Sequence, residues 1–219
     1  MGTIPLVRRA AVEENSGWQI VGVLERAAAL GLLALALPLM SICAALIRIR
    51  SGRTPLIAHR RVGRNGAPLW VLKLRTMWEP LAHPNVPPGA IEYIDDEGGP
   101  ECKVEKDPRV PGRLPQFLRR HSLDELPQLW HVVTGEMSLV GPRPLTGREL
   151  RKYYGASSEE VLRVRPGLAG LWQISGRNRL SYADRRRLDL EFVRHRSLSM
   201  YMQILIRTVP EVLRGRNSW

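Results

Sequence analysis

The sequence predicts an α+β fold dominated by helices, with one helix embedded in a membrane. A run of 21 uncharged residues extends from Ala27 to Ile47. Two short apolar-rich segments flank Asn65-Gly66, and apolar residues recur at helical spacing over 116–133 and 188–213. These patterns predict a membrane helix, a small β-hairpin and amphipathic helices in a chain of 219 residues, which is long enough for one or one and a half domains.

The uncharged run is long enough to lie within a membrane. At about 1.5 Å per residue it extends roughly 30 Å, the thickness of a hydrocarbon core. Pro38 lies in the middle of the run and predicts a kink, because it removes one helical hydrogen bond. We therefore expect an N-terminal arm over 1–19, a membrane-embedded kinked helix over 20–50 and a separate domain over 51–219.

The charges around this run predict which side of the membrane the following domain occupies. Arg48, Arg50 and Arg53 follow the run, as in a stop-transfer flank, which favours a membrane helix over a cleaved signal peptide. The positive-inside rule places the domain after these cations in the cytoplasm. The charges do not place the N-terminus, so a spanning helix and a re-entrant helix with both ends in the cytoplasm are both compatible with them.

The overall charge predicts an anionic partner. Lys and Arg total 33 against 21 Asp and Glu, a net charge of +12, which fits nucleic acid, an anionic membrane or phosphorylated substrates. Cys43 and Cys102 are too few for a disulfide framework or a zinc site. One acidic, Pro- and Gly-rich segment over 79–106 interrupts the basic chain. We expect it to be a solvated loop-rich insert, with a metal site around Asp95-Asp96-Glu97 as the alternative.

The predicted domain contains a hairpin followed by helices. The apolar-rich segments 55–62 and 68–75 lie on either side of Asn65-Gly66, which is a common hairpin turn sequence. A further helix is expected over Tyr153–Val164. The apolar stripe within Leu188–Leu213 predicts either an interfacial helix lying flat on the membrane or a helix packed against the core.

Two adjacent carboxylates, Asp124 and Glu125, are candidate catalytic residues. One interpretation is structural, because Ser122 and Glu125 have the spacing of a capping box. The other is chemical: Pro127 favours a helix start here, and a helix N-terminus favours carboxylates and phosphate. An ionised Asp can attack phosphorus, and a neighbouring Glu can hold Mg²⁺.

Arginines in tight turns accompany this pair. Arg143 lies between two prolines in Gly141-Pro-Arg-Pro144, and similar turns hold Arg165 and Arg177. A single surface arginine is usually only solvated. Several arginines in turns together with adjacent carboxylates predict a site that handles phosphate.

The ordered motifs of the chain strongly resemble those of the bacterial sugar transferases, in particular the small monotopic polyprenyl-phosphate sugar-1-phosphate transferases. The resemblance covers about residues 20 to 215. The motifs that carry it are Lys73-Leu-Arg-Thr-Met77, Asp107-Pro-Arg-Val110, Phe117-Leu-Arg-Arg120, Ser122-Leu-Asp-Glu-Leu-Pro-Gln-Leu129, Met137-Ser-Leu-Val-Gly-Pro-Arg-Pro144 and Arg165-Pro-Gly-Leu-Ala-Gly-Leu-Trp-Gln-Ile-Ser-Gly-Arg-Asn178.

The resemblance implies that 51–219 is a catalytic domain. It would transfer a sugar 1-phosphate from a UDP-sugar to undecaprenyl phosphate and release UMP, in the first membrane step of bacterial glycoconjugate synthesis (exopolysaccharide, capsule, O-antigen or glycoprotein glycan). The route would be ping-pong, with Asp124 as the nucleophile and Glu125 as the Mg²⁺ ligand. The residues expected to bind substrate or phosphate are Lys73, Arg75, Arg119, Arg143, Arg165, Arg177 and Asn178.

The resemblance also implies a re-entrant helix in the bacterial inner membrane, in contact with anionic lipids, and it allows a homodimer. The sequence departs from the usual pattern in places. Leu37 precedes Pro38 where Ser is familiar, and His131 stands where Asn is common. Glu136 stands where many members have Asp, as a candidate acid near the metal or a structural cap. Further departures are Pro115-Gln116, His121 and the insert over 79–106.

Two other functions are compatible with the charge alone. One is a membrane-tethered nucleic-acid-binding module, whose DNA affinity would fall steeply with salt. The other is a membrane scaffold that has lost activity. The nucleic-acid module leaves the carboxylate pair and the apolar run unexplained, and the intact Asp124-Glu125 pair argues against the scaffold. We therefore expect no nucleic-acid partner.

Overall fold

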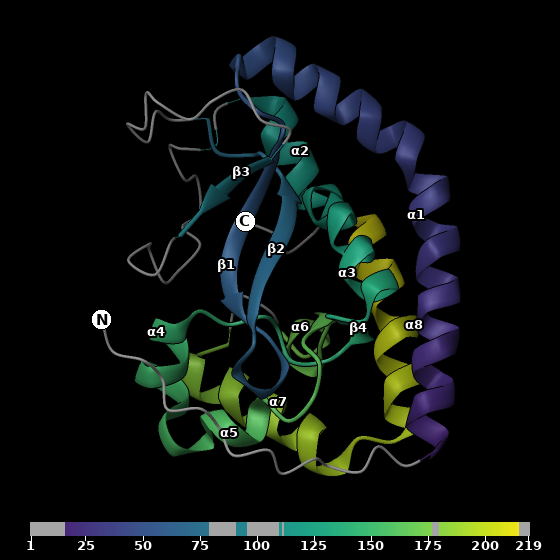
Figure 1. Cartoon of the computed structure of the whole chain (residues 1–219), viewed down its shortest axis with the longest axis vertical. Coiled ribbons are helices and arrows are strands. Elements are labelled where there is room, and N and C mark those ends of the chain that lie inside the picture. The colour runs from purple at the N-terminus through teal and green to yellow at the C-terminus, as the bar shows by residue number, and fades with distance from the viewer. Residues whose placement is uncertain (1–15, 79–90, 96–109, 111, 177–179, 215–219) are drawn as a thin grey trace.

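The computed structural model describes residues 16–78, 91–95, 110, 112–176 and 180–214. The described residues form a helix-dominated α+β fold, as predicted. A long N-terminal helix, α1 (Ser16–Ser51), runs along one side of the molecule, and the sheet and the remaining helices lie beside it (Figure 1).

Helix α1 contains the whole uncharged run and extends beyond it at both ends. It continues through Pro38 as one helix, and its ribbon changes direction along its length (Figure 1). The part of the chain that the structure describes has one helix long and apolar enough to cross a membrane, over Gly17–Ser51. Ala29, Cys43 and Ile47 are buried against the rest of the protein. Large apolar side chains cover the exposed face: Ile20, Val23, Leu24, Leu30, Leu32, Leu35, Leu37, Leu39, Ile42, Leu46 and Ile49.

The predicted β-hairpin is confirmed. Strands β1 (Leu56–Val62) and β2 (Pro68–Leu74) pair antiparallel, with Val62 opposite Pro68 at the turn. A short 3₁₀ turn, η1 (Arg64–Gly66), joins them, and Asn65 within it has φ 56°. Asn tolerates this left-handed conformation better than most residues, so the turn sequence explains the hairpin.

The loop-rich insert predicted over 79–106 contains a strand that was not predicted. Residues Ile91–Ile94 form β3, which pairs parallel to β1 and completes a sheet of order β2-β1-β3. Acids of this segment bind cations of the hairpin. Glu92 accepts a hydrogen bond from Arg75, and Asp95 lies 2.8 Å from Arg60. At least these two acids are therefore partners of the sheet; Asp96 and Glu97 lie outside the described residues.

The stretch predicted to be helical over 116–133 is divided into three elements: α2 (Arg113–Arg120), the 3₁₀ segment η2 (Leu123–Gln128) and α3 (Leu129–Thr134). The chain turns between α2 and η2 at Ser122, which has φ 54°. Leu129 and Val132 of α3 pack on Leu69 and Val71 of β2 and on Ala29 of α1. This cluster fixes α3 between the sheet and the apolar helix.

A second, two-stranded parallel sheet was not predicted. It pairs β4 (Ser138–Val140) with β5 (Gly167–Ala169). The backbones approach so closely after β4 that a Cβ on Gly167 would lie 2.0 Å from the backbone nitrogen of Gly141. This close approach requires glycine and sets the start of the Gly141–Pro144 turn.

The helix predicted over Tyr153–Val164 is broken into short pieces. A capped turn that follows Thr146 precedes them in the chain. The structure has α4 (Gly147–Glu149), η3 (Leu150–Tyr154), η4 (Gly155–Ser157) and α5 (Ser158–Val161), and later α6 (Leu171–Ile174). Gly155 has φ 49°, which ends the first piece because an α-helix needs a negative φ.

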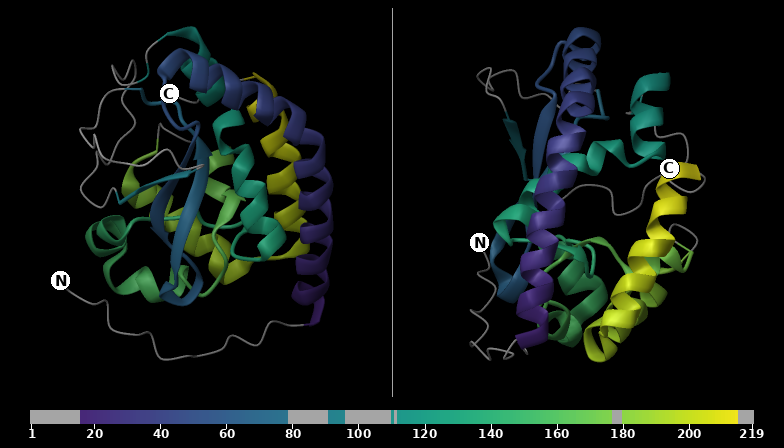
Figure 2. Two further views of the ribbon diagram at one scale, coloured as in Figure 1. Left: turned by 45° about the horizontal axis from the view of Figure 1, so that its top comes forward. Right: turned by 90° about the vertical axis from the view of Figure 1, so that its right-hand side faces the viewer.

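The apolar stripe over 188–213 belongs to two helices, α7 (Tyr182–His195) and α8 (Leu198–Arg214). Tyr201 and Ile204 of α8 pack in the core, whereas Met202, Ile206 and Val209 are exposed. Helices α1 and α8 meet near their N-terminal ends, where Trp18 packs on Tyr201 at 6.2 Å between ring centroids, and then diverge (Figure 2).

A buried carboxylate fastens α1 to the rest of the protein. Glu25 is only 4% exposed. Its Oε1 accepts hydrogen bonds from the Ser138 hydroxyl, the Tyr201 hydroxyl and the Leu139 backbone N–H, the last at 3.0 Å. Its Oε2 lies 3.4 Å from Arg165. Four donors thus converge on one side chain of α1.

Replacing Glu25 should loosen α1. We expect Glu25→Ala to lower the free energy of unfolding by roughly 3 kcal/mol, because it leaves Arg165 and two hydroxyls without their buried acceptor. Thermal unfolding of the detergent-solubilised protein measures the change. The control is Glu159→Ala on the exposed surface of α5, which should change stability by less than about 0.5 kcal/mol. Equal melting temperatures for the two variants would contradict the anchoring role.

Candidate active site

The adjacent carboxylates lie in the short 3₁₀ segment η2. Its first turn is held by the Glu125 N–H, which donates to the Ser122 carbonyl at 3.1 Å. Ser122 is in the left-handed conformation and its side chain makes no capping bond, so the capping-box interpretation is wrong. The Asp124 side chain is buried, and Glu125 is partly exposed. The turn thus depends on the Glu125 backbone and not on a capping bond from the Ser122 side chain.

Two cations from distant parts of the chain meet Glu125. The Lys73 ammonium, from β2, lies 2.9 Å from Glu125 Oε1. The Arg143 guanidinium, from the Gly141–Pro144 turn, lies 3.6 Å from the same oxygen. The structure thus brings Lys73 and Arg143 to Glu125, the neighbour of Asp124 in the carboxylate pair.

Arg119 reaches this region from α2. It is buried, and its carbonyl accepts the Ser122 N–H at 3.2 Å in the turn that leads into η2. Helix α2 is thus joined directly to the segment that carries Asp124, with Arg119 at the junction.

Two other predicted phosphate ligands have structural partners. Arg75 is buried and donates to the Thr54 carbonyl at 2.7 Å and to Glu92, so it ties β3 to the hairpin. Burial lowers the pKa of its guanidinium, and the Glu92 charge partly offsets that effect. Arg165 pairs with Glu25 of α1. The remaining two, Arg177 and Asn178, lie outside the described residues.

Glu136 has protein partners of its own. Its Oε2 lies 2.7 Å from His131 Nδ1 and 3.1 Å from the Thr134 hydroxyl. His131 is buried, and its Nε2 accepts the backbone N–H of Leu72 at 3.1 Å. Of the two interpretations of Glu136, these contacts favour the structural one.

A buried acid close enough to Arg143 to feel its charge was not identified from the sequence. Asp189 of α7 accepts a hydrogen bond from the Tyr154 hydroxyl at 2.6 Å, and its side chain is almost fully enclosed. Burial raises the pKa of Asp189 to about 7, against the lowering effects of Tyr154 and of the Arg185 and Arg143 charges. An acid flanked by Leu188 and Leu190 in a helical pattern is the signal that could have identified it.

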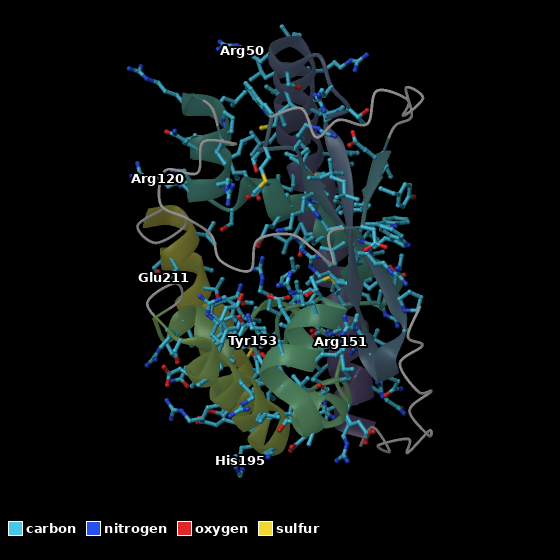
Figure 3. All side chains as sticks on the ribbon, turned by 90° about the vertical axis from the view of Figure 1, so that its left-hand side faces the viewer. Arg50, Arg120, Arg151, Tyr153, His195 and Glu211 are labelled. Carbon is cyan, nitrogen blue, oxygen red and sulfur yellow. The ribbon has the colours of Figure 1, made fainter. Side chains whose placement is uncertain are left out.

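An aromatic and cationic stack lies beside Asp189. Arg185 lies between the rings of Trp172 and Tyr182, at 4.8 and 5.0 Å from their centroids. Tyr182 stacks on Tyr153 at 3.9 Å. These contacts join α6, α7 and η3 into one unit. Tyr153, which is labelled in Figure 3, is the contact residue of η3. They help to fix the position of α7, which carries Asp189.

The donor set fits a metal that is shared with a substrate. Mg²⁺ in phosphate-handling proteins is usually held by one or two carboxylates together with phosphate oxygens and waters. Asp124 and Glu125 supply adjacent carboxylates. Among the residues that the structure describes, no group of three or more acids, histidines or cysteines could form a cage made of protein alone. The site therefore fits Mg²⁺ bound together with a diphosphate.

Comparison with known proteins gives consistent matches over most of the chain. The sequence model of the bacterial sugar transferase family matches residues 18–215. The exopolysaccharide production protein ExoY of Sinorhizobium fredii is 42% identical over 198 residues, which cover 88% of this chain and 84% of that protein.

Two further relatives have names that state an activity. The UDP-glucose:undecaprenyl-phosphate glucose-1-phosphate transferase of Caulobacter vibrioides is 36% identical over 207 residues, which cover 90% of this chain and 71% of that protein. The undecaprenyl-phosphate galactose phosphotransferase of Salmonella typhimurium is 39% identical over 173 residues, which cover 75% of this chain but only 34% of that protein.

The buried Asp189 predicts a pH effect on stability. Its pKa is about 7 in the folded protein against an ordinary 3.8, so the unfolded state loses the proton first and stability falls as the pH rises from about 4 to 7. Asp189→Asn removes this loss. We expect the free energy of unfolding of the variant to rise relative to wild type over that window, by up to about 4 kcal/mol.

Melting curves at several pH values test the prediction, with Asp184→Asn as the control. The hydrogen bond from Ser181 lowers the pKa of Asp184, so that variant should lose stability relative to wild type as the pH rises. Parallel curves for wild type and Asp189→Asn between pH 4 and 7 would show that Asp189 does not titrate there.

Proposed function

Because the chain belongs to the bacterial sugar transferase family, we propose that it transfers a sugar 1-phosphate from a UDP-sugar to undecaprenyl phosphate and releases UMP. The observation that carries the proposal is the meeting of Glu125, the neighbour of Asp124, with Lys73 and Arg143, from three separate segments. Relatives whose names state transfer to undecaprenyl phosphate support the acceptor.

The first half of the reaction forms a bond between Asp124 and phosphorus. A carboxylate oxygen of Asp124 attacks the β-phosphorus of the UDP-sugar, and the bond from that phosphorus to the bridging oxygen breaks. The electron pair leaves with UMP, and the sugar phosphate remains on Asp124. No proton transfer is needed, because the attacking carboxylate is ionised and UMP leaves as an anion.

The second half regenerates the carboxylate. A phosphate oxygen of undecaprenyl phosphate attacks the same phosphorus, and the bond to Asp124 breaks. The product is undecaprenyl diphosphate sugar. In both halves an anion approaches an anion, so the cations Lys73 and Arg143 next to Glu125 reduce the repulsion. Arg143 is also suited to phosphate because its fork matches two oxygens at once.

Glu125, with Asp124, would hold Mg²⁺ when the diphosphate is bound. The metal would neutralise part of the negative charge on the transferred group and on the departing UMP. The Lys73 ammonium lies 2.9 Å from Glu125 Oε1. This contact holds the Glu125 side chain in place.

Helix α1 would place this chemistry at the inner membrane. Its exposed apolar face suits lipid chains, and Arg48 and Arg50 at its C-terminal end suit anionic headgroups on the cytoplasmic side. Arg50, in the last turn of α1, and His195, the last residue of α7, lie at opposite ends of the molecule (Figure 3). We propose that α1 is re-entrant, with both ends in the cytoplasm, and that the exposed apolar side chains of α8 contact the membrane surface.

Asp124→Asn should abolish the reaction. Without a carboxylate nucleophile, we expect turnover to fall at least about a thousandfold. Incubation with a UDP-sugar labelled in the sugar or β-phosphate should label the wild-type protein and leave the variant unlabelled. Substantial labelling or turnover of the variant would overturn the assignment of Asp124.

Glu125→Gln is the matched variant in the same turn. It keeps Asp124, so it should still take the label, but it should need about tenfold more Mg²⁺ for half-maximal rate because one anionic ligand is lost. UMP release at increasing Mg²⁺ concentrations measures the shift. An unchanged Mg²⁺ dependence would remove Glu125 from the proposed metal site.

The re-entrant helix predicts that the N-terminus is inaccessible from outside the cell. In a variant with Cys43 and Cys102 replaced by Ser, a single cysteine introduced as Thr3→Cys should react with a membrane-impermeant thiol reagent only after the cells are opened. Labelling of sealed cells would instead favour a spanning helix.

A further inference from the structure

His131 joins α3 to β2 through a buried side chain. Its Nε2 accepts the Leu72 N–H at 3.1 Å, and its Nδ1 lies 2.7 Å from Glu136 Oε2. A ring nitrogen that accepts a hydrogen bond carries its lone pair, so in the neutral ring the proton is on Nδ1 and is donated to Glu136. Glu136 therefore fixes the tautomer that leaves Nε2 free to accept.

The Leu72 N–H belongs to an outer edge of the sheet. Strand β2 is the end strand in the order β2-β1-β3, so one of its edges faces β1 and the other has no partner strand among the described residues. An N–H that is shielded from water and has no acceptor is unfavourable, because it has given up its hydrogen bond to water. His131 provides the acceptor that a neighbouring strand would otherwise provide.

The residue after Leu72 is Lys73, whose ammonium reaches Glu125. Successive side chains of a strand point to opposite faces, so a shift by one residue would turn Lys73 away from η2. His131 accepts the backbone N–H of Leu72, the residue directly before Lys73. This hydrogen bond therefore holds β2 in the position that directs the Lys73 side chain towards η2.

We propose that His131 is a positioning residue, which holds β2 so that Lys73 meets Glu125, and that Glu136 keeps His131 in the required tautomer. The proposal rests on the proposed function, because that function gives Lys73 and Glu125 their role in the reaction. His131 and Glu136 are bonded to each other, so they form one unit.

Two substitutions separate the hydrogen bond of His131 from the space that its ring fills. His131→Gln can place an amide oxygen near the position of Nε2, whereas His131→Leu fills space without an acceptor. In hydrogen-exchange mass spectrometry, the peptide that contains β2 should exchange about tenfold faster in the Leu variant, and the Gln variant should keep most of the protection. Equal protection in wild type and the Leu variant would overturn the proposal.

A double-mutant cycle tests whether His131 acts through Lys73. His131→Leu should lower kcat about tenfold and change KM for the UDP-sugar less than about threefold, and His131→Gln should recover most of the loss. In a Lys73→Ala background the Leu substitution should have less than about a twofold effect, because the residue that it positions is absent. Independent losses in the double variant, or equal losses in the Leu and Gln variants, would overturn the proposal.

The two measurements also separate this proposal from the proposed function. A wild-type protein that releases no UMP from any UDP-sugar would contradict the proposed function. The exchange of the β2 peptide does not depend on turnover, so it would still decide whether His131 holds the strand.

Discussion

Glu25 is the point at which the apolar helix is fastened to the rest of the protein. Most side chains on the surface of α1 are aliphatic and similar to one another. Their packing alone does not select one rotation of the helix about its axis. A carboxylate that must meet Ser138, Leu139, Tyr201 and Arg165 at once allows only one rotation and one depth. Ala29, Cys43 and Ile47 then face the core, and leucines such as Leu35, Leu37 and Leu39 face outwards. This contact therefore helps to fix how α1 is oriented relative to the rest of the protein.

The reaction site depends on a second convergence, between segments that have little in common locally. Strand β2 brings Lys73, the 3₁₀ segment brings Asp124 and Glu125, and the turn after β4 brings Arg143. Each is rigid for a different reason: the first by strand pairing, the second by a left-handed residue before it, the third by two prolines and a backbone approach that only glycine permits. Little reorganisation is then needed when a diphosphate binds, which is the condition for effective electrostatic stabilisation.

The sequence predicted the features that depend on neighbouring residues or on composition. The hairpin follows from Asn65-Gly66, and the long helix follows from the uncharged run. Features that depend on distant partners were missed or misread. The parallel pairing of β3 needs a contact across an insert, and the pairing of Arg75 with Glu92 and of Arg165 with Glu25 joins segments that are separate in the sequence. The contacts of an arginine therefore depend on which acid the fold places beside it.

The order of the three-stranded sheet separates what can vary from what cannot. Strand β1 lies between β3, which belongs to the acidic insert, and β2, which carries Lys73. A family member could exchange the part of the insert outside β3 for one of another length or composition, provided that β3 keeps Glu92 as the partner of the buried Arg75. The side of the sheet next to β3 can therefore vary, whereas the side formed by β2 carries Lys73 and has to be kept. For protein engineering, the insert around β3 is the natural place to graft new loops.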